Sequence, residues 1–350
     1  KGKTTGVQLP NRLSYDVEHY ARKLLAEAEK EIGHLYPEGP DGKKPIAYYW
    51  ARVGTCANPT CRAKVPLLKQ FYLCNKPDKK FYLKPLISGT QIDFEIAEGE
   101  CKVEGFVQNR KSLVCPCCGN TTTNKELKQQ FLTTAIPEKL LAVIEGSENG
   151  KAYRLPTHSE LLVNANKENL ADNLPELLPI GNTKQFDLCP WGFTRYGDMF
   201  SARQLMALHT LVQKLGDIKK ELNSGENDYG KAVAAYLAIL VNRVAVVNTA
   251  FGRWHTGRET LEHPFARQAI AMVFDYPEST IFGKSAGSAK NHIDWLVRYI
   301  ESENETSFCT TLENASSGSK TQFPEKSLTA VVTDPPYYDA LAYADLSDFF

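Results

Sequence analysis

The chain lacks an excess of charge of either sign, since its 350 residues include 41 lysines and arginines and 41 aspartates and glutamates. This balance excludes a histone-like polycation and a chain that is acidic and disordered throughout. Long hydrophobic runs are also absent, because the longest candidate, residues 232–241, falls short of the ~20 apolar residues that cross a bilayer. The first 20 residues have no signal-peptide core. A cytoplasmic protein that does not bind membranes is therefore expected.

Several catalytic signatures are missing as well. No Ser/His/Asp arrangement and no two-histidine metal motif is visible in the sequence. The segment Phe282-Gly283-Lys284-Ser285 resembles the end of a nucleotide-binding P-loop, but Glu278 stands where that loop requires its first glycine. The P-loop interpretation is therefore rejected.

Cysteine, in contrast, is plentiful: nine is a high count for a cytosolic chain, and five of the nine lie in two tight clusters. In a reducing compartment such clusters indicate metal ligands before they indicate disulfides. Two close pairs of thiolates give Zn²⁺ a closed tetrahedral shell, which makes a structural site. Cys117 is an alternative to Cys118, although the two-residue spacing followed by Gly119 favours Cys118. The predicted ligands are Cys56, Cys61, Cys115 and Cys118.

The stretch that follows the first cluster is basic. Residues 52–84 contain eight lysines and arginines and a single acid, Asp78. Within it, residues 67–86 have the pattern of a β-hairpin, which is what a zinc ribbon requires between its cysteine pairs. This hairpin could lie on nucleic-acid phosphates, where each neutralised charge adds salt-dependent affinity, or it could be the solvated face of a scaffold. The formal charge of −2 on a four-thiolate zinc centre also suits the basic setting of Arg62, Lys64 and Lys111.

Hydrophobic periodicity predicts five helices and one notable strand. Ser14 and Ser201 are the expected N-caps of the first and third helices. Arg253, Trp254 and His255 follow the fourth helix and could touch DNA, although such a cluster is more often a packed helix end. The predicted helices span residues 13–35, 124–144, 201–222, 229–251 and 291–301, and the predicted strand spans residues 327–333.

Directly after that strand stands Asp334-Pro335-Pro336-Tyr337. In doubly wound α/β sheets, ligands bind beyond the carboxyl ends of strands. A carboxylate and a peptide carbonyl can accept hydrogen bonds from an exocyclic amine, and proline adds no competing N–H donor. The aromatic ring can stack on a base, which must leave the duplex to reach such a pocket. The segment therefore predicts methylation of a planar amine, whereas the simpler interpretation is a turn after a strand.

The surrounding sequence carries a family resemblance. Residues 331–350, VVTDPPYYDALAYADLSDFF, resemble the amine-methyltransferase motif of large prokaryotic adenine-specific DNA methylases that contain a zinc ribbon. Residues 27–37 (EAEKEIGHLYP), 50–61 (WARVGTCANPTC), 251–259 (FGRWHTGRE) and 265–278 (FARQAIAMVFDYPE) also resemble blocks of that family. Members often lie beside phage-defence or restriction-like genes.

The resemblance implies a Rossmann-like core that binds S-adenosylmethionine. The usual cofactor loop, Asp-Pro-Phe-x-Gly-x-Gly, does not occur in the sequence and is expected to precede residue 1. The chain would then be a fragment that lacks part of the cofactor pocket and is inactive alone. The position that contacts the cofactor's adenine in related enzymes matches Asn314, with Glu313 before it, and the amide departs from the family's acid.

We therefore predict an α/β fold: a partial Rossmann-like methyltransferase core with an inserted zinc ribbon and a helical segment. The predicted parts are a helical segment (1–45), the ribbon (46–125), a connector (126–200) and the DPPY half of the core (201–350). The resemblance implies a site-specific adenine N6-methyltransferase of restriction–modification or phage defence, with double-stranded DNA and other defence proteins as partners. Asp334, Pro335, Pro336 and Tyr337 are its expected catalytic residues, and S-adenosylmethionine and Zn²⁺ are its expected cofactors.

Two alternatives stay open from the sequence. The same acceptor geometry serves cytosine N4, an RNA base or a glutamine amide. A zinc-ribbon DNA-binding module without catalysis is the second alternative.

Overall fold

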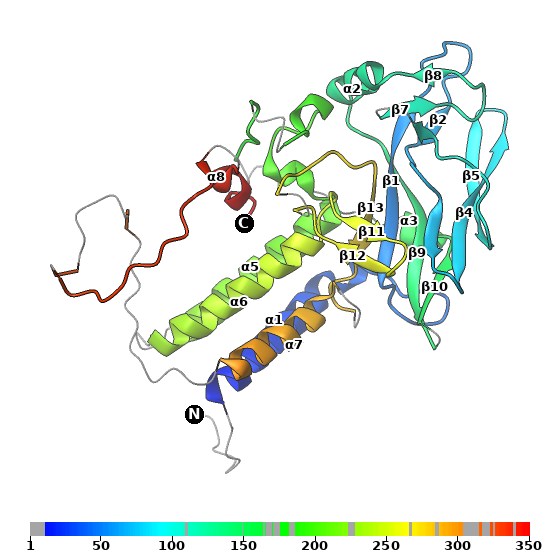
Figure 1. The fold of residues 1–350 in the computed structure, drawn as a ribbon. Helices are drawn as coiled ribbons and strands as arrows, with labels where there is room; N and C mark the ends of the chain where they lie inside the picture. The colour runs from blue at the N-terminus through cyan, green and yellow to red at the C-terminus, as the bar shows by residue number, and fades with distance from the viewer. Residues whose placement is uncertain are drawn as a thin grey trace.

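The protein is described here as a computed structural model of mixed α/β architecture (Figure 1). Long helices lie side by side in one part of the molecule, and the strands gather in the other. The structure describes residues 11–108, 111–148, 150–163, 165, 170, 176–181, 186–222, 228–265, 268–283, 287–303, 315–316, 323–324, 326–338 and 341–350.

The long helices are α1 (Arg12–Ile32), α5 (Ala202–Leu222), α6 (Asp228–Val247) and α7 (Ala289–Ser302), and they pack against one another. Each was predicted from hydrophobic periodicity, and these predictions are confirmed. The expected cap of α1 is wrong: the side chain of Asn11, not Ser14, accepts hydrogen bonds from the backbone N–H groups of Leu13 (2.9 Å) and Ser14 (3.1 Å). Ser201 does cap α5, since its hydroxyl accepts from the N–H of Gln204 at 3.2 Å.

Helix α6 is the one helix in the described part of the chain that is long and apolar enough to cross a membrane. Half of its apolar window (50%) is buried inside the protein, against α1, α5 and α7. A central helix of a packed core passes the same test of length and composition.

The main sheet has the strand order β10-β9-β1-β13, and β2 also pairs with β1. Every pairing between named strands in the described part of the chain is antiparallel. The described sheets therefore differ from the parallel sheet of a Rossmann-like core. The strands of the main sheet are β1 (Ala47–Thr55), β2 (Lys64–Pro66), β9 (Glu138–Ser147), β10 (Gly150–Arg154) and β13 (Asp275–Ser279).

Three smaller sheets accompany the main sheet in the described part of the chain. The predicted hairpin is confirmed as β3 (Tyr72–Asn75) and β4 (Lys80–Ser88), which β5 (Gln91–Glu98) completes into a three-stranded sheet. A second small sheet contains β6 (Val107–Gln108), β7 (Ser112–Val114) and β8 (Thr121–Thr122). The remaining elements are α2 (Asn124–Thr133), α3 (His158–Leu161), α8 (Tyr343–Ser347), the hairpin β11 (Arg253–His255) and β12 (Thr260–Glu262), and the 3-10 turns η1 (Gly33–Leu35), η2 (Cys189–Trp191) and η3 (Tyr196–Met199).

Two sequence predictions are corrected by these elements. The helix predicted over residues 124–144 ends at Thr133, and the chain then forms β9. Residues 140–144 are buried without interruption because the strand packs into two hydrophobic clusters, with Leu141, Ala142 and Ile144 in one and Leu140 and Val143 in the other, so no polar face marks it. The strand predicted over residues 327–333 is absent from the structure, where Val331 and Val332 are 74% and 95% exposed and no described strand pairs with them.

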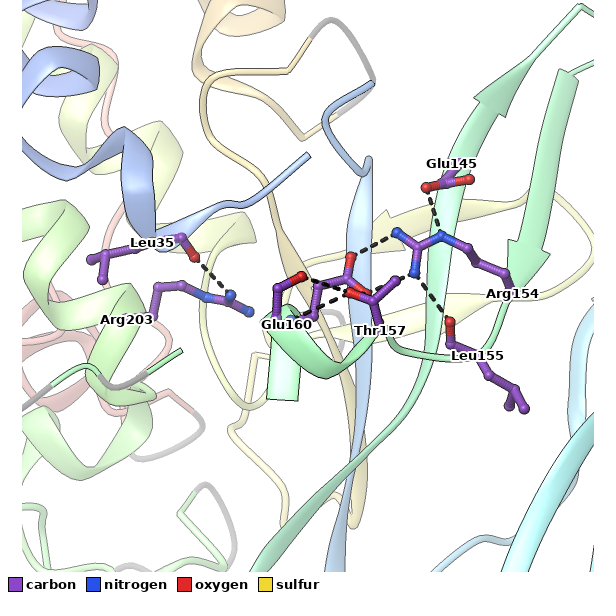
Figure 2. A network of polar contacts seen from close by, with 8 residues as sticks. Leu35, Glu145, Arg154, Leu155, Thr157, Glu160 and Arg203 are labelled. Carbon is purple, nitrogen blue, oxygen red and sulfur yellow. Dashed lines mark hydrogen bonds and ion pairs between the residues drawn. The ribbon is translucent and has the colours of Figure 1, made fainter. Parts of the chain in front are cut away.

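A charged cluster joins β9 and β10 to the short helix α3 (Figure 2). Arg154 donates two parallel hydrogen bonds to Glu160, both at 2.7 Å, and a third to Glu145 at 2.7 Å. Glu160 also closes a capping box with Thr157 at the start of α3. Burial would raise the pKa of Glu160, but the hydrogen bonds from Arg154 and Thr157 lower it below its ordinary value. The cluster therefore holds a charged carboxylate inside the fold.

A second buried ion pair ties the helices to the sheet. Arg203 of α5 donates to Glu278 of β13 and, at 3.0 Å, to the carbonyl of Leu35 after α1 (Figure 2). Its guanidinium also lies over the rings of Tyr36 (5.1 Å) and Tyr48 (4.0 Å). Removing one partner of such a buried pair typically costs ~3–5 kcal/mol.

Candidate metal centre and acceptor segment

The first cysteine pair lies in the turn that joins β1 to β2. Cys56 follows the last residue of β1, and its N–H donates to the carbonyl of Ala63 at 2.9 Å. The N–H groups of Cys61 and Arg62 both donate to the carbonyl of Asn58, at 3.1 and 3.0 Å. Arg62 adopts a left-handed conformation (φ 51°), which reverses the chain in the manner of a zinc knuckle.

The second pair lies in the turn that joins β7 to β8. The N–H of Cys115 donates to the carbonyl of Asn120 at 2.9 Å, and the N–H of Gly119 donates to the carbonyl of Cys115 at 2.8 Å. Gly119 has φ 74°, a conformation that glycine adopts without steric cost. Each knuckle is thus built by a β-hairpin with its own backbone hydrogen bonds.

The two knuckles bring four sulfur atoms together. The sulfurs of Cys56, Cys61, Cys115 and Cys118 all lie within 4.8 Å of one another. Two of the separations are 3.7 Å (Cys56 to Cys118) and 3.8 Å (Cys61 to Cys115). A tetrahedral centre with Zn–S bonds of about 2.3 Å places its sulfurs about 3.8 Å apart. The four cysteines could therefore hold a metal ion, and their spacing is compatible with zinc.

Neighbouring groups favour the thiolate form of Cys118, whereas burial raises the pKa of Cys56. A hydrogen bond from the backbone N–H of Asn120 lowers the pKa of Cys118 to about 7. The side-chain amide of Asn58 also approaches the Cys118 sulfur at 3.7 Å. Cys117 is not a member of the four-cysteine cluster.

Two of the three cations expected to set the charge around the centre are bonded to oxygen acceptors. Lys64 donates to the hydroxyl of Thr55 at 2.8 Å, and Lys111 pairs with Asp187 at 2.6 Å. Arg62 is exposed. The two lysines are directed to oxygen acceptors, which bind ammonium groups more strongly than sulfur does.

Helix α2 fixes the ribbon to the main sheet, a feature that the sequence did not reveal. Gln130 makes two hydrogen bonds to the backbone of Thr55, accepting from its N–H (2.9 Å) and donating to its carbonyl (2.8 Å). A Cβ atom at Gly54 would lie 2.8 Å from a methyl group of Leu127, so a larger residue would require the Leu127 side chain to shift where α2 packs on β1. The first knuckle therefore begins at a strand end that α2 holds both by hydrogen bonds and by side-chain packing.

The acceptor segment is arranged differently. All four residues Asp334–Tyr337 are exposed, and in Figure 1 residues 326–338 run outside the packed helices and strands. No described residue donates a hydrogen bond to the Asp334 carboxylate, and the ring of Tyr337 is 61% exposed. The backbone N–H of Tyr337 donates to the hydroxyl of Tyr343 at 3.2 Å.

The pockets formed by described residues do not include the segment. The cavity of 610 Å³ near the last residues is lined by α5, α6 and the aromatic pair Phe349 and Phe350, and not by Asp334 or Tyr337. The predicted cofactor contacts, Glu313 and Asn314, lie outside the described residues.

A charged cluster at the tip of the β3–β4 hairpin was also missed from sequence. It joins Lys76 and Lys79 of the turn to Glu259 and Lys151, which are more than 70 residues away along the chain. The only sequence signal was the basic composition of the hairpin turn, which does not identify a carboxylate partner.

Comparison with known proteins adds no family to this description. No family model matches the chain, and no curated protein or solved structure matches it either.

Proposed function

We propose that the chain is part of a DNA methyltransferase that modifies the N6 amine of adenine. The observation that carries this proposal is the Asp334-Pro335-Pro336-Tyr337 segment, whose acceptors are open to solvent and are not used by described neighbours. Its combination with a four-cysteine cluster is the pattern expected of the zinc-ribbon adenine methylases that the sequence resembles.

The chemistry assigned to the segment concerns the acceptor amine. The N6 lone pair of adenine is delocalised into the ring, so the nitrogen is a poor nucleophile. Hydrogen bonds from its two hydrogens to the Asp334 carboxylate and the Pro335 carbonyl would favour a more tetrahedral nitrogen. Pro336 restricts the backbone between these acceptors and Tyr337. Stacking of the base on Tyr337 would contribute ~1–3 kcal/mol.

S-adenosylmethionine is the methyl donor that this proposal requires. The described residues do not offer a fitting pocket for it: no described strand leads into Asp334, and the sequence has no Asp-Pro-Phe-x-Gly-x-Gly loop. The mechanism assigned to this chain is therefore limited to holding the target amine.

The metal centre has a structural role in this proposal. Four thiolates fill a tetrahedral shell and leave no position for water or substrate, so a zinc ion there would organise the hairpins without reacting. Together with α2, it would present the β3–β4–β5 sheet as a rigid extension of the main sheet.

The test identifies the acceptor. The complete natural protein is incubated with duplex DNA and methyl-labelled S-adenosylmethionine, and the digested nucleosides are separated by mass spectrometry. Labelled N6-methyladenine is expected. Labelled N4-methylcytosine, or label in RNA or protein glutamine instead, would show that the methyl acceptor is another planar amine. DNA binding without label in any acceptor would contradict the enzymatic proposal and favour a zinc-ribbon binding module.

A further inference from the structure

Two lysines pair with one buried carboxylate, and a third binds the backbone carbonyl of the same residue, where three hairpins (β3–β4, β9–β10 and β11–β12) meet. Lys76 and Lys79 of the β3–β4 turn both pair with Glu259, and the second of these ion pairs measures 2.9 Å. Lys151 of β10 donates to the backbone carbonyl of Glu259. The hydroxyl of Tyr153 donates to the same carboxylate at 2.7 Å. We name Lys76, Lys79, Lys151 and Glu259 the lysine cluster.

The cluster carries a surplus of positive charge, and its two lysines on the β3–β4 turn are partly exposed. Two ammonium groups pair with the carboxylate and the third binds the backbone carbonyl, which leaves a formal charge of +2. The Glu259 side chain is buried beneath the lysines and is 5% exposed, whereas the side chains of Lys76 and Lys79 are 34% and 23% exposed. Like charges at this separation repel one another, so a second anion above the lysines would be attracted.

The lysines are held in place rather than free to move. Lys79 donates to the carbonyl of Lys151 at 2.6 Å and lies over the ring of Tyr153 at 5.6 Å. Lys151 lies over the ring of Trp254 at 5.6 Å, and Trp254 is itself fixed by a hydrogen bond to the Leu73 carbonyl at 2.6 Å. A preorganised set of cations loses little side-chain entropy when it binds an anion.

The β3–β4 and β11–β12 hairpins are also connected by a backbone hydrogen bond. The N–H of Asn75 donates to the carbonyl of Thr256 at 3.1 Å. Glu259 adopts a left-handed conformation (φ 51°), which is uncommon for a residue other than glycine and persists only where its surroundings enforce it. The charges around the cluster are mixed, and the flanking groups are Asp78, Arg253, His255, Arg258 and Glu262.

We propose that the lysine cluster binds the phosphodiester backbone of duplex DNA. This proposal rests on the proposed function, because both take duplex DNA as the substrate. It adds the surface on which the DNA backbone lies. Lysine ammonium groups contact phosphates as point charges without reading bases, so this surface would position the duplex and leave sequence selection to other residues. The basic hairpin thereby acquires a role beyond that of a solvated scaffold.

Salt-dependent binding tests this proposal. The protein is titrated against a fluorescent 30-base-pair duplex by anisotropy at several salt concentrations. In the Lys76→Gln/Lys79→Gln variant, loss of two phosphate contacts is expected to reduce the slope of log Kd against log salt by about 2, since each contact contributes about 0.9. Affinity at low salt is expected to fall on the order of ten-fold or more.

The matched control is Lys84→Gln/Lys139→Gln, which removes the same charge from two exposed lysines that pair with Glu95 and Asp93. Its slope is expected to stay near that of the unmodified protein. Equal slopes for the two double variants, or an unchanged slope for the cluster variant, would overturn the proposal and leave a structural ion-pair network.

Folding of each variant is followed by thermal melting. If the double variant does not fold, Lys76→Gln alone is expected to reduce the slope by about 1, and an unchanged slope contradicts the proposal. Lys76→Arg/Lys79→Arg, which keeps the charge, is expected to restore the slope. The binding assay contains no methyl donor, so failure of DNA binding and failure of methyl transfer are separate results. Binding of an RNA duplex but not of DNA would also overturn the assignment.

Discussion

The two cysteine knuckles and the acceptor segment are both short motifs, yet the knuckles are organised by local hydrogen bonds and the acceptor segment is not. Each knuckle is closed by backbone hydrogen bonds within a few residues, and α2 fixes the strand end from which the first begins. The acceptor segment has no strand beside it and is exposed along its whole length. A motif that contains its own hydrogen-bond partners is organised locally, whereas Asp334–Tyr337 have one hydrogen bond to a described residue, from the Tyr337 N–H to Tyr343.

The comparison separates the two roles that we assign. The ribbon would stabilise without reacting, because a closed shell of four thiolates offers no open position. The acceptor segment would hold the target amine without stabilising the fold, because exposed residues contribute little to folding. Substitutions in the two regions should therefore affect different measurements.

The largest effect is expected at the metal centre. Cys118→Ser should reduce zinc content from about one equivalent per chain to near zero, because it removes one of four ligands. The binding free energy of structural zinc, on the order of 10 kcal/mol, would be lost from the ribbon. Zinc is measured by mass spectrometry of the purified protein after dialysis.

Cys117→Ser is the matched control for this substitution. Cys117 is adjacent in sequence but is not a member of the four-cysteine cluster, so its zinc content should stay near one equivalent. Full loss of zinc in Cys117→Ser, with retention in Cys118→Ser, would reverse the assignment of the ligands.

A smaller effect is expected from Glu259, which lies beside the ribbon's basic hairpin. Burial would raise its pKa, but hydrogen bonds from Lys76, Tyr153 and Lys79 lower it to about 2, from an ordinary value of 4.5. The ionised carboxylate thus stabilises the fold above pH 4.5, and this stability is lost as the pH falls from 4.5 towards 2. The expected loss is about 3 kcal/mol.

Urea unfolding at a series of pH values measures this contribution. The difference in unfolding free energy between the unmodified protein and Glu259→Gln should shrink across the same interval. A difference that stays constant from pH 5 to pH 2.5 would show that the carboxylate does not titrate as described.

The smallest effects compare the two regions directly. Thr123→Ala removes the capping box of α2 and should destabilise the protein by about 1 kcal/mol. Val332→Ala in the exposed segment should change stability by less than about 0.5 kcal/mol, because its side chain contacts little. Chemical unfolding compares the two, and a larger cost at Val332 would indicate that residues 327–333 are packed.

Sequence patterns predicted those parts of the fold whose signals are local. The helices α1, α5, α6 and α7 follow from apolar residues at three- and four-residue steps. Strand β9 was mistaken for helix because its residues 140–144 are covered on both faces, so the chain shows no alternation. A short apolar run cannot be assigned to helix or strand by periodicity alone.

The candidate sites show the same limit. The spacing of the cysteine pairs was sufficient to predict which four sulfurs converge, since each knuckle is a local turn. The lysine cluster joins Lys76 to Glu259, which is 183 residues away, and Lys151 to the same residue, which is 108 residues away. No spacing rule relates such residues, because the packing of three hairpins, β3–β4, β9–β10 and β11–β12, brings them together.

The most direct test of the division between scaffold and chemistry is the rate of methyl transfer to duplex DNA by the complete protein carrying Asp334→Ala. The account predicts a decrease on the order of 100-fold or more, as expected when one oriented hydrogen-bond partner is removed, with zinc content and melting temperature unchanged. Transfer at the unmodified rate by this zinc-loaded variant would contradict the account.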